Sequence, residues 1–85
     1  MSWRVAVTKY AAKQLQRLPK DDANRIQAAI DEMEENPFQG DVTKLGGEED
    51  IWRRRLGSYR ILYKVLTKKR LIYVYDLRRR TSSTY

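Results

Sequence analysis

The sequence contains no cysteine and no histidine. Without cysteine, the chain can form neither disulfide bonds nor thiolate ligands. The absence of histidine removes a common metal ligand and the side chain that most often exchanges protons near neutral pH. Disulfide-stabilised scaffolds, thiol chemistry and histidine-based acid–base catalysis are therefore excluded, and we expect neither a metal site nor any other cofactor.

Long apolar segments are also missing. The first residues, MSWRVAVTKYA, contain no apolar stretch long enough for a signal peptide, and no segment approaches membrane-spanning length. We therefore expect a cytoplasmic protein without a membrane partner. A chain of 85 residues is typical of one domain, so residues 1–85 are predicted to form a single unit with one small core.

Acidic residues are scarce in the last part of the chain. Residues 51–85 contain eleven lysines and arginines, whereas Asp76 is their only acidic residue; residues 1–50 contain seven basic and ten acidic residues. Basic side chains contact phosphates, and aromatic rings stack on unpaired bases. The C-terminal part therefore predicts binding to RNA or another polyanion, and its aromatic residues are Trp52, Tyr59, Tyr63, Tyr73, Tyr75 and Tyr85.

The N-terminal half predicts one strand and two helices. Trp3, Val5 and Val7 alternate with smaller or polar residues, as in a half-buried strand. Thr8 is a suitable N-cap for a helix that ends near Pro19. A second helix is expected to start at Asp21 or Asp22 and to stop before Pro37, and its acidic side is interpreted as a solvated surface.

The C-terminal half predicts three strands, at about 51–56, 58–66 and 70–77, joined by short turns. Residues 37–50 lack a clear period and predict a loop, with Leu45 as a candidate anchor. The order β-α-α-β-β-β indicates an α+β fold. We expect a mostly antiparallel four-stranded sheet with a helical hairpin packed on one face.

Strand alternation sorts the basic residues onto two faces. Tyr59, Ile61, Tyr63 and Val65 form the natural core side of their strand, so Arg60 and Lys64 should lie on an open surface. If Trp52 and Leu56 pack inward, Arg53 and Arg55 join Arg60 on that surface. Three guanidiniums on neighbouring strands could clamp a phosphate. The alternative is that these charges only protect a sheet edge from aggregation.

Arg54 does not fit this alternation, because it occupies a position that favours an apolar residue. Either its long side chain extends past the helices to solvent, or the predicted register is wrong by one residue. The pattern alone leaves both interpretations open.

The run IWRRRLGSYRILY at residues 51–63 resembles the signature of the RelE/ParE toxin superfamily. That signature combines a basic strand, a G-x-Y-R turn and an apolar strand that ends in tyrosine. Leu18-Pro19, Asn36-Pro37 and Lys44-Leu45-Gly46-Gly47 agree with the family in order and spacing. The resemblance covers essentially the whole chain.

This resemblance implies the toxin of a type II toxin–antitoxin system, bound by a cognate antitoxin in a hetero-oligomer. RelE-like members are ribosome-dependent, metal-independent endoribonucleases that cut mRNA in the A site through attack by the RNA 2′-hydroxyl. ParE-like members instead poison DNA gyrase without a catalytic site. A member that only binds antitoxin or RNA is a further alternative. The leading prediction is the mRNA endonuclease, with the ribosome and mRNA as partners.

The resemblance also implies roles for individual residues. Arg60 matches the arginine that orients the scissile phosphate, and Arg53 and Arg55 fall where RelE carries paired lysines. Counting back from the last residue favours Arg79 as the general acid. Tyr85 matches a tyrosine that stacks on the substrate base, although a terminal tyrosine could also be a frayed end. The predicted RNA-binding residues are Arg53, Arg55, Arg60, Lys64, Arg78, Arg79 and Arg80.

A general base is not evident among these residues, since arginine keeps its proton at any ordinary pH. Tyr59 and Tyr63 could act as bases only if exposed, and we expect both to be core residues. The predicted site would therefore work mainly by holding the phosphate in line and neutralising charge on its oxygens.

Overall fold

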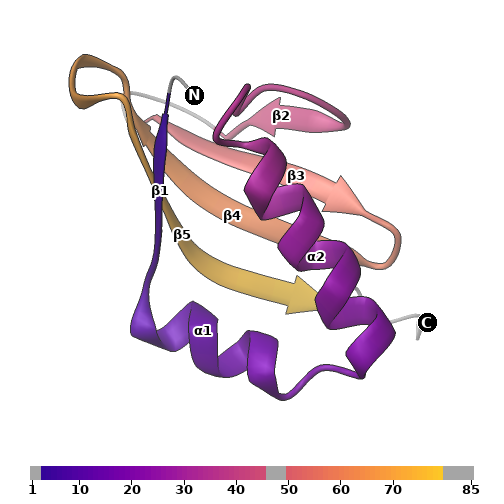
Figure 1. Cartoon of the computed structure of the whole chain (residues 1–85). Helices are drawn as coiled ribbons and strands as arrows, with labels where there is room; N and C mark the ends of the chain where they lie inside the picture. Colours follow the sequence, from indigo (N-terminus) through magenta and orange to yellow (C-terminus); the bar gives the residue numbers. More distant parts are fainter. Residues whose placement is uncertain (1–2, 46–49, 80–85) are drawn as a thin grey trace.

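The computed structural model describes residues 3–45 and 50–79, which form two helices and a five-stranded sheet (Figure 1). The strand order is β1-β5-β4-β3-β2; β1 runs parallel to β5, and the other neighbours are antiparallel. The predicted α+β class is confirmed. The elements are β1 (Arg4–Val7), α1 (Lys9–Gln16), α2 (Lys20–Glu32), β2 (Val42–Lys44), β3 (Ile51–Leu56), β4 (Tyr59–Leu66), the short 3-10 turn η1 (Thr67–Lys69) and β5 (Leu71–Arg79).

The sheet has one strand more than the four predicted, because β2 lies within the expected loop at residues 37–50. Backbone hydrogen bonds hold this edge strand: Arg55 N donates to the Asp41 carbonyl at 2.9 Å, and Leu45 N donates to the Ile51 carbonyl at 2.8 Å. Three residues are too few to show a side-chain period. Leu45 is not the anchor, since its side chain is 37% exposed, whereas Pro37 is fully buried.

Residues at the N-terminus of each helix explain where the helix begins. Thr8 caps α1 as predicted, and its Oγ1 accepts from Ala11 N at 3.2 Å. The second helix, α2, begins at Lys20, one residue earlier than expected, with Asp21 and Asp22 in its first turn. Carboxylates are favourable there because the helix dipole is positive at its N-terminus. Within the described ranges neither helix is long and apolar enough to cross a membrane.

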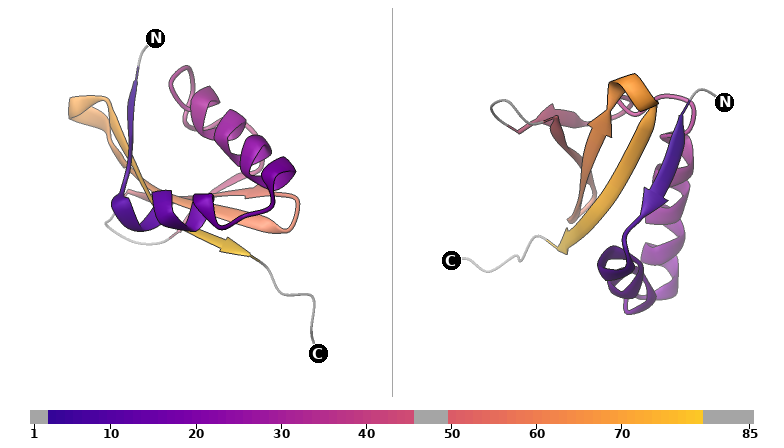
Figure 2. Two further views of the ribbon diagram at one scale, coloured as in Figure 1. Left: turned by 60° about the horizontal axis from the view of Figure 1, so that its bottom comes forward. Right: turned by 90° about the vertical axis from the view of Figure 1, so that its left-hand side faces the viewer.

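The two faces of the sheet have different surroundings. Both helices lie on the same side, where α2 crosses the sheet and α1 packs against β5 (Figures 1 and 2). We call this side the covered face and the opposite side the open face. The predicted alternation in β4 is confirmed, because its odd-numbered residues are buried on the covered face. The core residues include Ile26, Ile30, Met33, Tyr59, Ile61, Tyr63, Val65, Ile72 and Val74.

Candidate nucleic-acid interface

Three arginines on adjacent strands stand opposite one another on the open face. Arg55 of β3 pairs with Arg60 of β4, and Arg60 pairs with Arg78 of β5. Directly opposed residues in antiparallel strands place their Cβ atoms about 5 Å apart, where like charges repel. We call this set the arginine row. It concentrates positive charge at one end of the sheet, as an anion-binding surface would.

Other predicted RNA-binding residues extend the same face away from the arginine row. Arg53 pairs with Leu62, and Leu62 pairs with Asp76. Lys64 is the next residue after Leu62 on the open face of β4, and it lies opposite Tyr73. The structure therefore brings Arg53, Arg55, Arg60, Lys64 and Arg78 onto one surface.

Arg60 carries the most informative polar atom of this surface. Its side chain is half-buried, and its Nε, like that of Arg54, is buried without a hydrogen-bond partner among the residues that the structure describes. An unpaired buried donor is unfavourable by about 1–3 kcal/mol. An anionic oxygen that reached this N–H would remove the penalty, and Arg60 stands at the centre of the arginine row.

Arg79 lies on the other face. It pairs with Tyr59, and its guanidinium carbon is 5.9 Å from the centroid of the Tyr59 ring, on the covered side. Arg78 is therefore the residue that shares a face with Arg60. Counting back from the last residue favours Arg79, but such counting carries no information about the face that a strand residue occupies. Its catalytic role stays a prediction, and Arg80 and Tyr85 lie outside the described residues.

Three of the five described aromatic residues in the basic segment are unavailable for base stacking. Tyr59 and Tyr63 belong to the core, and Trp52 packs against it with its ring centroid 4.7 Å from that of Phe38. Tyr73 differs, since it lies on the open face and is 39% exposed. The expectation that Tyr59 and Tyr63 are core residues is confirmed, and alternation turns Trp52 inward beside them.

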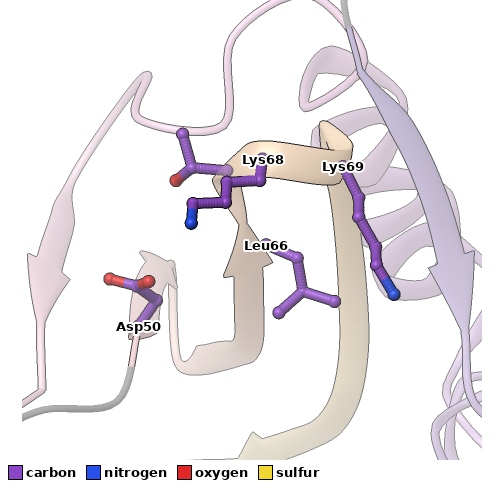
Figure 3. Close-up of a pocket in the computed structure, with 5 residues that line it drawn as sticks. Asp50, Leu66, Lys68 and Lys69 are labelled. Carbon is purple, nitrogen blue, oxygen red and sulfur yellow. The ribbon is translucent and has the colours of Figure 1, made fainter.

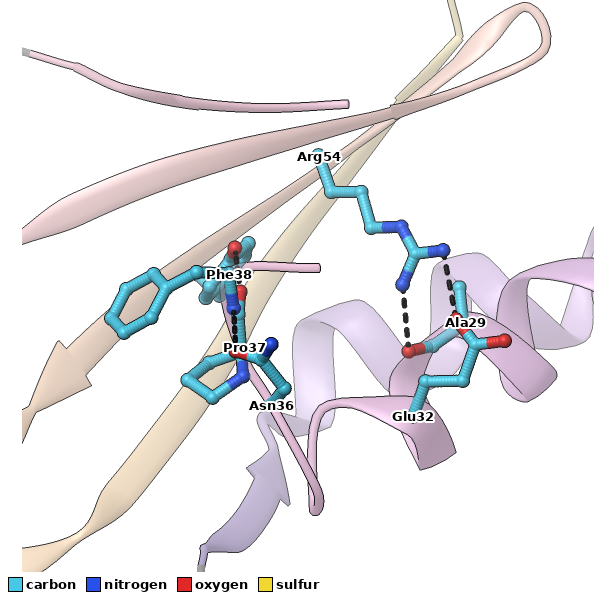
Figure 4. Close-up of polar contacts among 7 residues, drawn as sticks. Ala29, Glu32, Asn36, Pro37, Phe38 and Arg54 are labelled. Atoms are coloured by element: carbon cyan, nitrogen blue, oxygen red, sulfur yellow. Dashed lines mark hydrogen bonds and ion pairs between the residues drawn. The ribbon is translucent and has the colours of Figure 1, made fainter. Parts of the chain in front are cut away.

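Arg54 follows neither of the two alternatives that the sequence left open. The register is as predicted, and the side chain does not extend to solvent: the residue is 9% exposed. Its Nη2 lies 2.8 Å from Glu32 Oε1, and its Nη1 donates to the Ala29 carbonyl at 3.3 Å (Figure 4). Gly40, with φ +88°, leaves room for it, since a Cβ there would meet Arg54 Nε at 3.0 Å. Arg54 therefore ties β3 to α2.

Two tyrosines anchor β4 beside Arg60. Tyr59 OH donates to Asp22 Oδ2 at 2.9 Å, and Tyr63 OH donates to the Pro37 carbonyl. Burial raises the pKa of Tyr59, with the hydrogen bond and charge of Asp22 adding to the effect. Burial also raises the pKa of Tyr63 to about 12, although Arg54 acts in the opposite direction. Both phenols therefore stay protonated, and neither can act as a base near neutral pH.

A hollow of about 390 Å³ lies at the opposite end of the sheet from the arginine row, where β4 turns into β5 (Figure 3). It contains none of the predicted site residues. Its lining consists of Asp50, Leu66, Thr67, Lys68 and Lys69. Across residues 3–45 and 50–79, acidic side chains form no group of three or more that could hold a metal ion.

The sequence interpretation missed two residues beside the arginine row. Asp76 bonds to Arg78, and Gln14 of α1 bonds to Asp76. The sequence singles out Asp76 as the only acidic residue among residues 51–85, but this pattern gives the residue no role. Gln14 gives no signal in the sequence, since its contacts lie more than 60 positions away in the chain.

Known proteins resemble this chain over nearly its whole length. A family model described as the ParE toxin of the type II toxin–antitoxin system, parDE, matches residues 5–83. The candidate toxin RelE1 of Methanocaldococcus jannaschii is 29% identical over 83 residues, which cover 94% of this chain and 92% of the relative.

Solved structures agree with this assignment. A chain of the archaeal RelE–RelB complex from Pyrococcus horikoshii OT3 superimposes with a TM-score of 0.87 and 36% identity, covering 98% of this chain and 100% of that one. The isolated Escherichia coli RelE toxin has a TM-score of 0.80 over 95% of this chain and 87% of its own; at 22% identity it supports the fold alone. The chain therefore belongs to the ParE toxin family of type II toxin–antitoxin systems, within the RelE/ParE superfamily.

Proposed function

We propose that this toxin is a ribosome-dependent endoribonuclease that cleaves mRNA in the A site without a metal ion. One observation carries the proposal: the arginine row, in which Arg55, Arg60 and Arg78 stand opposite one another on the open face. The oxygens of a scissile phosphate would neutralise this concentration of positive charge and could accept hydrogen bonds from its guanidinium groups. The 36% identity to an archaeal RelE chain supports the same assignment.

The chemistry follows from what arginine can and cannot do. The RNA 2′-hydroxyl attacks the adjacent phosphorus, the bond from phosphorus to the 5′-oxygen breaks, and a 2′,3′-cyclic phosphate and a 5′-hydroxyl result. Arg60 would hold the phosphate in line and stabilise the charge that builds on its oxygens. Because arginine keeps its proton, the arginine row contributes charge and orientation rather than base catalysis. The ribosome would then supply much of the RNA positioning.

A ParE-like gyrase poison is the second candidate. The name of the matching family model favours it, as does the lack of a side chain suited to act as a general base: the sequence has no histidine, and Tyr59 and Tyr63 are buried. The open face would then contact a protein rather than RNA, and Arg60 would have no catalytic role.

We also propose that a cognate antitoxin binds this toxin in a hetero-oligomer. The solved archaeal relative is a RelE–RelB complex. A partner that binds only the native toxin stabilises it, by about 2.7 kcal/mol at a hundred-fold excess over Kd. A melting temperature that stays constant with a saturating amount of the adjacent gene's product would contradict this pairing.

The proposed activity is tested on purified ribosomes carrying a defined mRNA. The wild-type toxin should cut within the A-site codon, and Arg60→Ala should cut about 10²–10³-fold more slowly, the usual effect of losing a contact to transition-state charge. Arg60→Lys should recover only part of the rate, because an ammonium cannot reproduce the guanidinium's paired hydrogen bonds. The control is Arg17→Ala, which removes an exposed arginine at the end of α1.

The same proteins are added to a gyrase supercoiling reaction. The proposal expects no inhibition there. If wild-type toxin leaves mRNA intact but traps gyrase on broken DNA, the nuclease assignment is wrong and the ParE-like function replaces it.

A further inference from the structure

The side chain of Gln14 completes the edge of β5 beyond the end of β1. Strand β1 pairs with β5 only as far as Val74. Further along, Leu77 N donates to Gln14 Oε1 at 2.8 Å, and Gln14 Nε2 donates to the Leu77 carbonyl at 2.9 Å. One side-chain amide thus satisfies two backbone groups that a neighbouring strand would otherwise satisfy. The contact fixes α1 relative to β5.

The same amide also holds Asp76. Gln14 Nε2 donates a second hydrogen bond, 3.0 Å long, to Asp76 Oδ1. The other carboxylate oxygen, Oδ2, accepts from Arg78 Nε at 2.9 Å. The Asp76 side chain is only 15% exposed, whereas that of Arg78 is 67% exposed. A largely buried carboxylate, itself held by α1, therefore fixes one end of an exposed guanidinium.

This arrangement distinguishes the pair from an ordinary surface ion pair. Exposed ion pairs contribute little because both side chains must be ordered to form them. Here Gln14 already holds the Asp76 carboxylate in place, so only the Arg78 side chain loses conformational entropy when the pair forms. With Nε bonded to Asp76, the two Nη groups of Arg78 remain available to donate to phosphate oxygens.

We infer that Asp76 and Gln14 are positioning residues, which hold the Arg78 guanidinium on the open face for the phosphate that Arg60 binds. The inference rests on the proposed function. It assigns Asp76 an effect on the rate of cleavage rather than on RNA affinity, because the carboxylate orients a cation and does not itself attract RNA. Loss of orientation at a reacting phosphate slows the reaction even when binding persists.

The main test is a double-mutant cycle of Asp76→Asn and Arg78→Ala, measured as single-turnover cleavage on programmed ribosomes. Asp76→Asn should slow cleavage about ten-fold through lost orientation. The affinity of this variant for single-stranded RNA should be unchanged or higher, because the substitution removes a negative charge that repels phosphate. In the Arg78→Ala background, Asp76→Asn should have no further effect. Asp76→Glu should recover part of the rate.

Two outcomes of the cycle would overturn the inference. One is an Asp76→Asn toxin that cleaves as fast as the wild type. The other is a pair of effects that multiply independently, since a carboxylate that acts through Arg78 has nothing left to position once Arg78 is gone.

An NMR measurement separates this inference from the proposed function. The Arg78 Nε–H signal should exchange slowly with water in the wild type and rapidly in Asp76→Asn and Gln14→Met, with the fold checked from the backbone amide spectrum. If the wild type shows the slow signal but never cuts mRNA, the proposed nuclease function fails while the positioning contact stands. If the signal exchanges as fast in the wild type as in Asp76→Asn, the positioning role is wrong whatever the activity.

Discussion

The covered and open faces of the sheet use the same residue type in opposite ways. On the covered face, both Nη groups of Arg54 have partners on α2. On the open face, one residue further along β3, Arg55 stands opposite Arg60 in a row of like charges. The buried Nε of both Arg54 and Arg60 has no partner among the described residues. The same residue type is a structural tie in one place and, as we propose, an anion-binding group in the other. Its face, rather than its type, decides which.

This difference has an energetic consequence. Arg54 lowers the free energy of the folded state through its contacts with Ala29 and Glu32. The arginine row raises the free energy of the folded state, since opposed like charges repel. Binding sites often carry such local conflicts because the ligand resolves them. Removing Arg54 should therefore impair folding, whereas removing a member of the arginine row should impair function.

The largest expected effect on stability comes from Arg54→Ala. The substitution leaves a void between β3 and α2 and breaks two hydrogen bonds, so we expect a loss of about 2–3 kcal/mol in the free energy of unfolding. Urea denaturation followed by circular dichroism measures it. Arg54→Met, which refills the space without the charge, should lose less.

The matched control is Arg55→Ala, which removes the exposed neighbour on the other face of β3. It should change stability by no more than about 0.5 kcal/mol, as is usual for surface substitutions. Equal losses of unfolding free energy for Arg54→Ala and Arg55→Ala would mean that the two faces do not use arginine in different ways.

A smaller effect concerns Tyr63 at alkaline pH. The folded protein keeps the phenol proton up to a pKa of about 12, whereas an exposed tyrosine ionises near 10. The contribution of Tyr63 to stability is therefore complete below pH 10 and is lost as the pH rises toward 12. In urea titrations, the stability difference between wild type and Tyr63→Phe should be constant up to about pH 9 and fall above pH 10. A constant difference up to pH 12 would mean that Tyr63 is not held protonated by burial.

Alternation predicted the faces of the sheet well, because a period of two is a local property of a strand. Tyr59, Ile61, Tyr63 and Val65 are buried, and Arg60 lies on the opposite side, as expected. Strand β2 could not be predicted, since backbone pairing with β3 rather than its own pattern defines it. The position of Arg54 depends on a carbonyl and a carboxylate of α2, more than 20 residues away.

The surroundings of Arg78 show the same limit within the candidate site. The predicted strand ends at about residue 77, so the basic run 78–80 falls after it, whereas β5 extends to Arg79. Only cross-strand pairing shows that Arg78 faces Arg60 and that Arg79 does not. A bulge between Leu62 and Tyr63 shifts the β4–β5 register, so counting along the chain cannot assign the face. The sequence therefore shows that basic residues gather here, whereas the face that each of them occupies depends on the pairing of the whole sheet.

We propose that arginines of the open face contact phosphate and that Arg54 does not. This proposal is tested by the salt dependence of binding to a short single-stranded RNA, followed by fluorescence anisotropy. Each phosphate contact contributes about −0.7 to the slope of log K against log[salt], so four contacts from Arg53, Arg55, Arg60 and Arg78 predict about −3. Arg60→Ala should reduce the slope to about −2, and Arg54→Met should leave it unchanged. A slope near zero, or one that falls for Arg54→Met and not for Arg60→Ala, would contradict the claim.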